Sequence, residues 1–201
     1  MQRTSLLLSL IVICFVTPLR AQTSAPKPDP ELKKLHVLVG HWTYEGEYKP
    51  GPLGGGSKVK GVWDARMILG GFFLHEEVNE KVDAGESHAL GIESYDPVNK
   101  EFITNWYQSD GSRYSGALTI TGNTVIWAGP LEVGRKHYQF RETFVCTADF
   151  MSGTSKREVS TDGKTWIPFW EAKFVKASRN EELAGECVAT PTRHKSAFAA
   201  H

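Results

Sequence analysis

Alternation of hydrophobic and polar residues with a period of two dominates the chain from position 42 onward. In residues 59–67, for example, Val59, Trp63 and Met67 fall on one face while Lys60 and Arg66 fall on the other. This pattern is typical of strands with one buried face, and segments rich in Gly, Asn, Asp and Pro separate the runs. The predicted strands span residues 42–48, 59–67, 72–81, 88–95, 102–108, 114–120, 124–128, 137–146, 151–160 and 166–175.

The links between consecutive strands are short, which favours antiparallel neighbours in an up-and-down order. An open sheet of this size would leave two unpaired edges, and closure into a barrel removes both. We therefore predict an all-β fold, an antiparallel up-and-down barrel of about ten strands. Residues 129–135 are interpreted as a loose connection. A barrel with more than eight strands is too wide for its own side chains to fill, so this topology also predicts an internal cavity.

A helical period precedes the first strand. The positions that recur on one face at helical spacing are Leu32, Leu35, His36 and Val39. Asp29 can cap such a helix, Pro30 suits its first position, and Gly40 is placed to end it. A helix this short must dock on apolar surface. We expect it to cover one mouth of the barrel, with Trp42 packed beneath it.

The first residues have the order of a secretory signal peptide. Arg3 precedes the uncharged apolar run 6–16, which is too short to span a bilayer, and Ala21 offers a small residue for cleavage. Export to the periplasm or the exterior is therefore predicted, without a stable membrane anchor. The predicted divisions are a signal peptide at 1–21, a linker at 22–29, a barrel domain at 30–176 and a flexible tail at 177–201.

The formal net charge of the 201-residue chain is zero. Loss of Arg3 and Arg20 with the signal peptide would make it about −2, so no basic excess exists to attract nucleic acid or anionic lipid. Two cysteines would remain, Cys146 and Cys187. An oxidising compartment permits a disulfide between them, and the alternative is a buried thiol and a separate tail residue. The pattern says nothing about oligomeric state.

Several short motifs resemble known barrels in their order and spacing. The segment Gly40-His41-Trp42 after a helical turn resembles the entry of calycin barrels, which include lipocalins and haem-binding relatives. From about Leu35 to Lys176 the chain resembles a bacterial domain-of-unknown-function family of small, often exported, lipocalin-like barrels. The segments that carry this resemblance are 69–73, 95–97, 160–166 and 171–176. The resemblance implies a barrel and a cavity, but no established reaction.

Two details depart from the calycin pattern. Lipocalins commonly place an arginine over the entry tryptophan, whereas here Lys173 or Lys176 would have to provide a cation–π contact to Trp42. Haem-binding relatives use a histidine late in the chain, where this sequence has His194 and His201 in the predicted tail. The resemblance therefore disfavours haem, and we predict no cofactor.

Two glutamates occupy apolar rows of the predicted strands. Glu76 lies in the row of Leu74 and Val78, and Glu142 lies in the row of Phe140 and Phe144. A carboxylate in such a row must be paired or must have a raised pKa. Two of them facing one cavity would form a candidate acid–base or ligand-anchoring pair. The alternatives are that the rows reach the barrel rim there, or that arginines at positions 113 and 141 pair with the glutamates.

Histidines and aromatic residues supply the remaining candidates. His88 shares a predicted face with Leu90 and Ile92, so it is either a cavity histidine or a hydrogen-bonded core residue. The chain has no closely spaced histidine pair and no CxxC, hence no metal site is predicted. Strand aromatics are usually core residues, but in a wide barrel they line the pocket. The predicted ligand-binding residues are Trp63, Leu74, Glu76, His88, Trp106, Tyr114, Trp127, Tyr138, Phe140 and Glu142.

The leading hypothesis is an exported barrel that binds a small, largely apolar molecule in its interior. The second is an enzyme on the same scaffold that uses Glu76, Glu142 and His88 for proton transfer. The third is an envelope interaction protein without a small ligand, which an exposed apolar patch would favour.

Overall fold

The computed structural model describes residues 25–177, and this part of the chain forms a closed barrel. The strands are β1 (Gly40–Tyr48), β2 (Ser57–Ile68), β3 (Phe73–Val82), β4 (Gly85–Asp96), β5 (Glu101–Gln108), β6 (Arg113–Thr121), β7 (Thr124–Val133), β8 (Lys136–Cys146), β9 (Ser152–Ser160) and β10 (Ile167–Lys176). The predicted signal peptide, most of the predicted linker and nearly all of the predicted tail lie outside the described residues, so they stay predictions.

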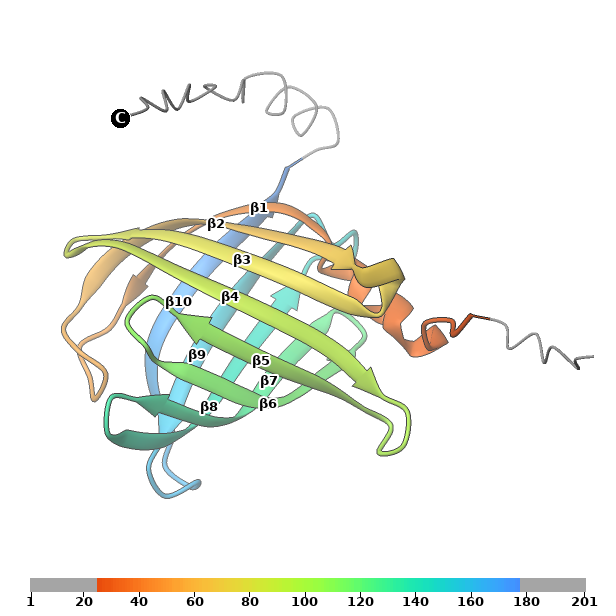
Figure 1. The fold of residues 1–201 in the computed structure, drawn as a ribbon. Coiled ribbons are helices and arrows are strands. Elements are labelled where there is room, and N and C mark those ends of the chain that lie inside the picture. Colours follow the sequence, from red (N-terminus) through yellow and green to blue (C-terminus); the bar gives the residue numbers. More distant parts are fainter. Residues whose placement is uncertain (1–24, 178–201) are drawn as a thin grey trace, which may run out of the picture.

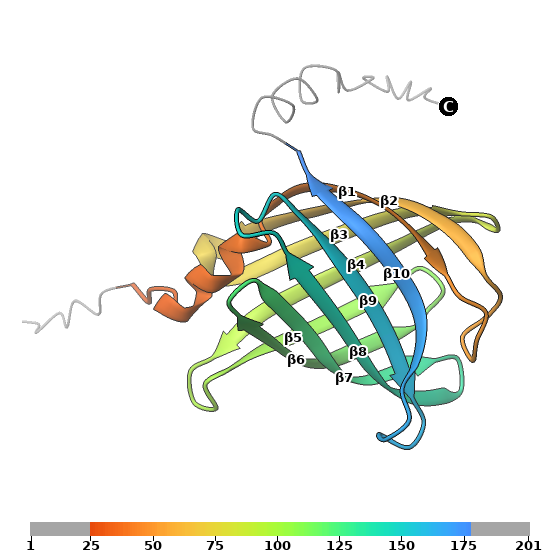
Figure 2. The same ribbon diagram turned by 180° about the vertical axis from the view of Figure 1, so that it is seen from behind.

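Each strand pairs antiparallel with its neighbours in sequence, and β1 pairs with β10 to close the barrel. The strands tilt around one closed barrel with the first and last strands side by side, as the two opposite views show (Figures 1 and 2). The closing pair brings Trp42 opposite Lys176. The predicted fold class, an all-β up-and-down barrel of ten strands, is confirmed. No helix within residues 25–177 is long and apolar enough to cross a membrane.

Strand β7 is longer than the sequence suggested. Residues 129–133, which we interpreted as part of a loose connection, continue the strand to Val133. Pro130 lies opposite Gln139 of β8, and the alternation continues to the buried Leu131. A proline without an N–H is tolerated here because the ladder to β6 is interrupted between Tyr114 and Ala117.

The N-terminal helix η1 (Pro30–Val37) is a 3-10 helix, and Asp29 caps it by accepting a hydrogen bond from the Glu31 backbone N–H at 2.9 Å. With three residues per turn, every third side chain faces the barrel. The buried row is Leu32, Leu35 and Leu38. His36 is therefore exposed, contrary to the predicted face. Gly40 has a φ of +139° and opens β1 rather than ending the helix.

Helix η1 closes one end of the barrel, as predicted, and lies at the right-hand end in Figure 1. The Trp42 indole N–H donates to the carbonyl oxygen of Leu38 at 2.8 Å. The Trp42 ring stacks on Trp63 with a centroid separation of 5.4 Å. The Lys176 Nζ lies 4.9 Å from the Trp42 ring, so the cation–π contact comes from Lys176 while Lys173 is exposed. The N–H and the ring of Trp42 are thus both occupied by groups of the chain itself, so this end of the barrel is a plug.

Candidate functional site

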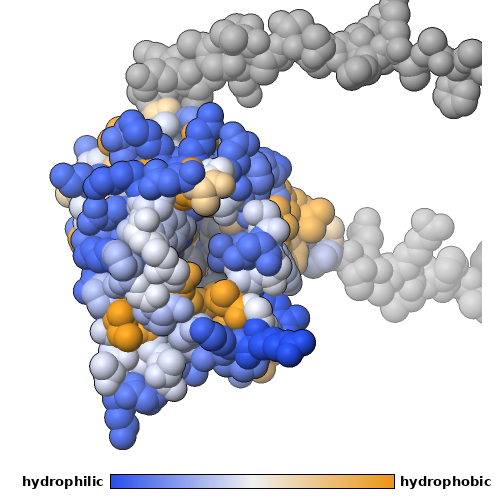
Figure 3. Space-filling view, turned by 90° about the vertical axis from the view of Figure 1, so that its left-hand side faces the viewer, coloured by the Kyte–Doolittle hydropathy of each residue, from blue (hydrophilic) through white to orange (hydrophobic). Residues whose placement is uncertain are grey.

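The barrel is hollow at the end opposite η1. A cavity of about 360 Å³ opens there between the loops that follow β1, β3 and β5. Figure 3 looks into this mouth and shows a recess bordered by hydrophobic residues within a mostly hydrophilic rim. The aromatic residues that line the cavity are Tyr44, Tyr48, Trp63, Trp106, Tyr114, Trp127, Phe140, Phe144, Phe169 and Phe174. A volume in this range suits a small organic molecule.

Six of the ten predicted ligand-binding residues line this cavity: Trp63, Trp106, Tyr114, Trp127, Phe140 and Glu142. Leu74 and Glu76 are fully buried in β3 but do not line the cavity. Tyr138 is buried outside the lining, and its hydroxyl lies 3.4 Å from the carbonyl oxygen of Pro52. His88 does not line the cavity either.

His88 faces the outside of the barrel, so its predicted place in the cavity is wrong. It is exposed, and its Nδ1 lies 2.6 Å from Oδ1 of Asn79. Alternate residues of β4 face inward, and the prediction chose the wrong set. The inward row holds Ala89, Gly91 and Glu93 rather than the more apolar residues between them. The predicted proton-transfer set of Glu76, Glu142 and His88 is consequently not brought together.

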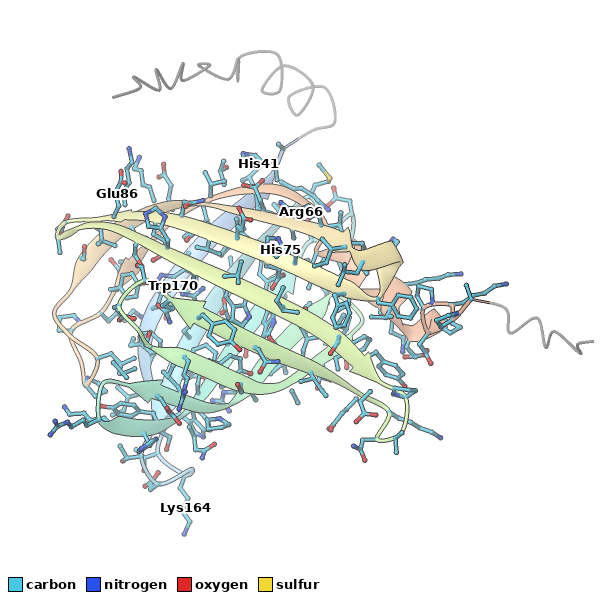
Figure 4. The ribbon with its side chains drawn as sticks, in the orientation of Figure 1. His41, Arg66, His75, Glu86, Lys164 and Trp170 are labelled. Carbon is cyan, nitrogen blue, oxygen red and sulfur yellow. The ribbon has the colours of Figure 1, made fainter. Side chains whose placement is uncertain are left out.

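The other described histidines also lie away from the cavity. His41 Nδ1 contacts Asp64 at 2.6 Å, and His75 Nε2 lies 3.5 Å from Glu77. Figure 4 shows His41 and Arg66 on the outer surface and Trp170 inside the barrel. His75 alternates with the inward-facing Leu74 and Glu76 of β3, and its side chain is 13% exposed. Among the described residues no histidine lines the cavity, and no group of three or more His, Cys, Asp or Glu side chains could hold a metal ion.

The polar groups near the mouth form one connected network around Arg157. Glu80 accepts hydrogen bonds from the Tyr44 hydroxyl at 2.6 Å and the Tyr48 hydroxyl at 2.8 Å. Burial and the Glu80 carboxylate raise the pKa of both phenols, which keeps them protonated as donors. Arg157 Nη1 lies 4.0 Å from Glu80. This network fixes four polar side chains, Tyr44, Tyr48, Glu80 and Arg157, in a cavity that is otherwise largely aromatic.

Arg157 also holds Glu142. Its Nε donates to Glu142 Oε2 at 2.8 Å, while Ser155 donates to the other oxygen at 2.6 Å. The guanidinium lies over the Trp170 ring at 3.9 Å. The expected alternatives for Glu142, arginines from β6 and β8, are wrong because those side chains pair with glutamates elsewhere. The partner comes from β9, a strand whose polar sequence hid its inward-facing row.

A second pair of carboxyl groups lies deeper than the network. Glu76 of β3 and Glu93 of β4 are fully buried diagonal neighbours on the inner face. Glu93 accepts from the Trp127 indole N–H at 2.5 Å and lies 3.4 Å from the Thr104 hydroxyl. Burial raises the pKa of Glu93 from 4.5 to about 7. Burial, and then the charge of Glu93, hold the pKa of Glu76 well above its usual value.

Sequence reasoning identified Glu76 and missed Glu93 together with Glu80 and Arg157. The signal for Glu80 was present, since it continues the inward row of β3 two residues beyond Val78. Glu93 had no such signal, because the residues that precede it in the inner row (Ser87, Ala89 and Gly91) are small and the more apolar row of β4, with Leu90 and Ile92, faces outward. The hydrophobicity of the side chains in β4 therefore predicted the wrong inward-facing row for this strand.

The comparisons with known proteins concern the whole barrel. The family model described as "Protein of unknown function (DUF1579)" matches residues 27–176. The chain belongs to the DUF1579 family. This agrees with the resemblance to a domain-of-unknown-function family of barrels. No curated protein matches the DUF1579 chain.

Solved structures similar to the DUF1579 barrel are distant in sequence. Rv2717c from M. tuberculosis aligns with a TM-score of 0.56 and 13% identity, covering 76% of this chain and 100% of its own. An S-type phycobiliprotein lyase, CPES from Guillardia theta, aligns at 0.49 and 10%, covering 73% and 92%. A de novo designed fluorescence-activating β-barrel aligns at 0.38 and 12%, covering 71% and 95%. At such identity, the likeness to Rv2717c shows a shared fold.

The predicted disulfide and the tail histidines involve residues outside the described part of the chain. Cys146 is buried at the end of β8, and burial raises the pKa of its thiol to about 11. Cys187 lies outside the described residues, so the pairing of the two cysteines stays a prediction. The tail histidines His194 and His201, considered for haem, also lie outside the described residues.

Proposed function

We propose that the DUF1579 barrel binds a small, largely apolar molecule in the cavity at its open end. The observation that carries this proposal is the asymmetry between the two ends. The plugged end is filled by Leu35, Leu38 and Trp42, whereas the other end leaves about 360 Å³ among aromatic rings. A protein that used its interior only for stability would gain from filling it, because empty apolar space costs free energy.

The polar groups support a binding role as well. Pockets for small molecules are mostly apolar, with a few fixed polar groups that orient the ligand. Tyr48, Glu80, Glu142 and Arg157 are such groups, because each lines the cavity and is held by other side chains. Holding them in place before binding lowers the entropy lost when a ligand enters.

The test is titration with the neutral fluorescent probe N-phenylnaphthylamine. We expect saturable binding with an increase in probe fluorescence. Ala89 lines the cavity from β4, and the next residue, Leu90, faces outward with 38% exposure. An Ala89→Trp variant should fill the cavity and abolish binding, while Leu90→Trp on the same strand should leave it unchanged. Equal binding by both variants would place the probe elsewhere and overturn the proposal.

The natural ligand is accessible by native mass spectrometry of the barrel purified from its own host. We propose that this ligand is met outside the cytoplasm, after removal of residues 1–21. The mass of the purified chain checks the second statement independently, since a mature chain would begin at Gln22. A chain that retains residues 1–21 in the envelope fraction would refute export by cleavage.

A further inference from the structure

We propose that the ligand of the DUF1579 barrel is an uncharged carbonyl compound, whose oxygen accepts hydrogen bonds from the outer nitrogen atoms of Arg157 in the cavity. This inference rests on the proposed binding function and specifies the chemical class of the molecule. Three observations support it: the donors that Arg157 leaves unused, the carboxylates that surround it, and the aromatic side chains beside it.

Arg157 has more hydrogen-bond donors than the chain uses. A guanidinium carries five N–H groups. Nε donates to Glu142, but neither outer nitrogen, Nη1 or Nη2, has a hydrogen-bond partner among the described residues. Glu80 lies 4.0 Å from Nη1, which is too far for a hydrogen bond. The side chain of Arg157 lines the cavity and is 22% exposed, so these donors are available to a molecule inside it.

The guanidinium of Arg157 is held in one orientation. Its centre lies 3.9 Å from the centre of the Trp170 ring, which is fully buried and covers one face of the group. Glu142 holds the Nε side. The edge that carries Nη1 and Nη2 is therefore what remains for a ligand. Both nitrogen atoms can donate to one carbonyl oxygen, because that oxygen has two lone pairs.

The charges around Arg157 favour an uncharged acceptor. Of the described residues, the charged ones that line the cavity are Lys49, Glu80, Asp110, Glu142 and Arg157, so acidic groups outnumber basic ones. Lys49 is paired at 2.6 Å with a glutamate of β10. A carboxylate ligand on Arg157 would lie close to both Glu80 and Glu142 and would be repelled by them. An uncharged oxygen accepts the same hydrogen bonds without this repulsion.

The acceptors next to Arg157 already have donors from the chain. Glu80 accepts from two tyrosine hydroxyls, one at each carboxylate oxygen. Glu142 accepts from Ser155 at one oxygen and from Arg157 at the other. Each of these four oxygens therefore has a donor, whereas Nη1 and Nη2 have no acceptor. Donors without a partner are costly in a covered site, so a ligand that brings an acceptor complements this network.

Aromatic side chains beside Arg157 provide a surface for the rest of the ligand. Arg157 lies opposite Glu142 in the ladder between β8 and β9, and Phe140 and Phe144 flank Glu142 on the inner face of β8. Both rings line the cavity. Phe169 of β10 lines it as well, with its ring centre 6.4 Å from that of Phe140. An oxygen bound to Arg157 thus directs the apolar part of the molecule toward phenyl rings.

The test compares three probes of similar shape, substituted at the same ring position: acetylnaphthalene, isopropenylnaphthalene and naphthoate. The second replaces the carbonyl oxygen with a CH₂ group, and the third carries a carboxylate. Each is titrated at pH 8 by competition with N-phenylnaphthylamine. The ketone should bind about tenfold more tightly than the alkene, as expected for a hydrogen bond from a charged donor, and more tightly than naphthoate. The ratio of ketone to alkene affinity is the readout, because a looser cavity would weaken both probes alike.

Substitutions of Arg157 locate the effect. Arg157→Lys keeps a positive charge beside Glu142 but removes the outer nitrogen atoms, so the ratio should fall several-fold. Arg141→Lys is the matched control and should leave the ratio unchanged. Arg141 also pairs with a glutamate, Glu158, at 2.6 Å and lies over a tryptophan, Trp166, but it does not line the cavity. If Arg157→Lys fails to fold, Arg157→Met combined with Glu142→Met removes both charges of the pair and gives the same readout.

Infrared spectroscopy of the wild type provides a measurement that needs no variant. A hydrogen bond to a carbonyl oxygen lowers the stretching frequency of the carbonyl group. Acetylnaphthalene bound to the barrel should therefore absorb at a lower frequency than acetylnaphthalene in hexane. A band at the hexane position would overturn the inference.

The outcomes separate the two proposals. Equal affinity for the ketone and the alkene, or tighter binding of naphthoate than of the ketone, would overturn this inference and leave the binding function standing. An unchanged ratio in the variants of Arg157 would overturn the assignment of the oxygen to this residue. Failure of all three probes, with N-phenylnaphthylamine also excluded, would overturn the binding function and this inference with it.

Discussion

The buried Glu93 predicts an unusual dependence of stability on pH. Its pKa rises from 4.5 to about 7 because burial disfavours the ionised form. Between these values the folded protein keeps a proton that the unfolded chain has released, so the free energy of unfolding must fall as pH rises. At 1.36 kcal/mol per pH unit, this carboxyl alone removes roughly 3 kcal/mol of stability between pH 4.5 and 7. Glu76 acts in the same direction.

The assay is urea unfolding of the wild type and Glu93→Gln at pH 5 and pH 8. Glutamine can still accept the hydrogen bond from Trp127. We expect little difference between the two proteins at pH 5, where Glu93 is protonated. At pH 8 the variant should be more stable than the wild type by about 2–3 kcal/mol. Carboxyls with lowered pKa values, such as Asp96 and Asp149, lose their stabilising effect only in more acidic solution.

Equal destabilisation by Glu93→Gln at both pH values would contradict the raised pKa of Glu93. A wild type that loses no stability between pH 5 and pH 8 would contradict it as well. Glu77→Gln on the outer face of β3 is the control, and we expect it to change the free energy of unfolding by less than about 0.5 kcal/mol at either pH.

Three further predictions follow from single contacts. Gly91→Ala would place a methyl group 2.5 Å from the Trp106 ring, so this variant should lose stability and weaken N-phenylnaphthylamine binding in the same titration. Arg157→Met would leave the largely covered Glu142 without its cation and should cost up to about 3–5 kcal/mol in urea unfolding at pH 8. A neutral effect would contradict the ion pair. Trp42→Phe removes the indole donor at the plug and should cost about 1–3 kcal/mol, measured in the same way, without altering probe affinity.

The sequence predicted the barrel well because alternation, short links and turn residues all agree with one topology. It located the plug for the same reason, since Trp42 and the leucines of η1 leave few alternatives for docking. It failed at β4, where the rule that the apolar row faces inward gives the wrong answer. Leu90 is outside and Glu93 is inside because this interior is partly a polar surface.

The partly polar interior also explains why the sequence did not identify Arg157 as an inward-facing residue. A barrel with polar groups in its interior contrasts less strongly between its two faces than a barrel filled with apolar side chains, so hydrophobicity cannot assign the faces of polar strands such as β9. Pairing registers can, because Arg157 lies opposite Glu142 in the ladder between β8 and β9. Such registers depend on the whole closed barrel, so the sequence of a single strand does not predict them.

The closure of the barrel by β1 and β10 also dictates when the protein can fold. Trp42 pairs with Trp63 of β2 on one side and with Lys176 of β10 on the other, so the second edge of β1 stays unpaired until the last strand has been made. Contacts this far apart in sequence are slow to form. A chain still emerging from the ribosome lacks β10, and its first strand presents an open edge throughout synthesis. Premature termination anywhere before β10 should therefore yield a chain with two exposed edges that is prone to aggregation, rather than a smaller barrel.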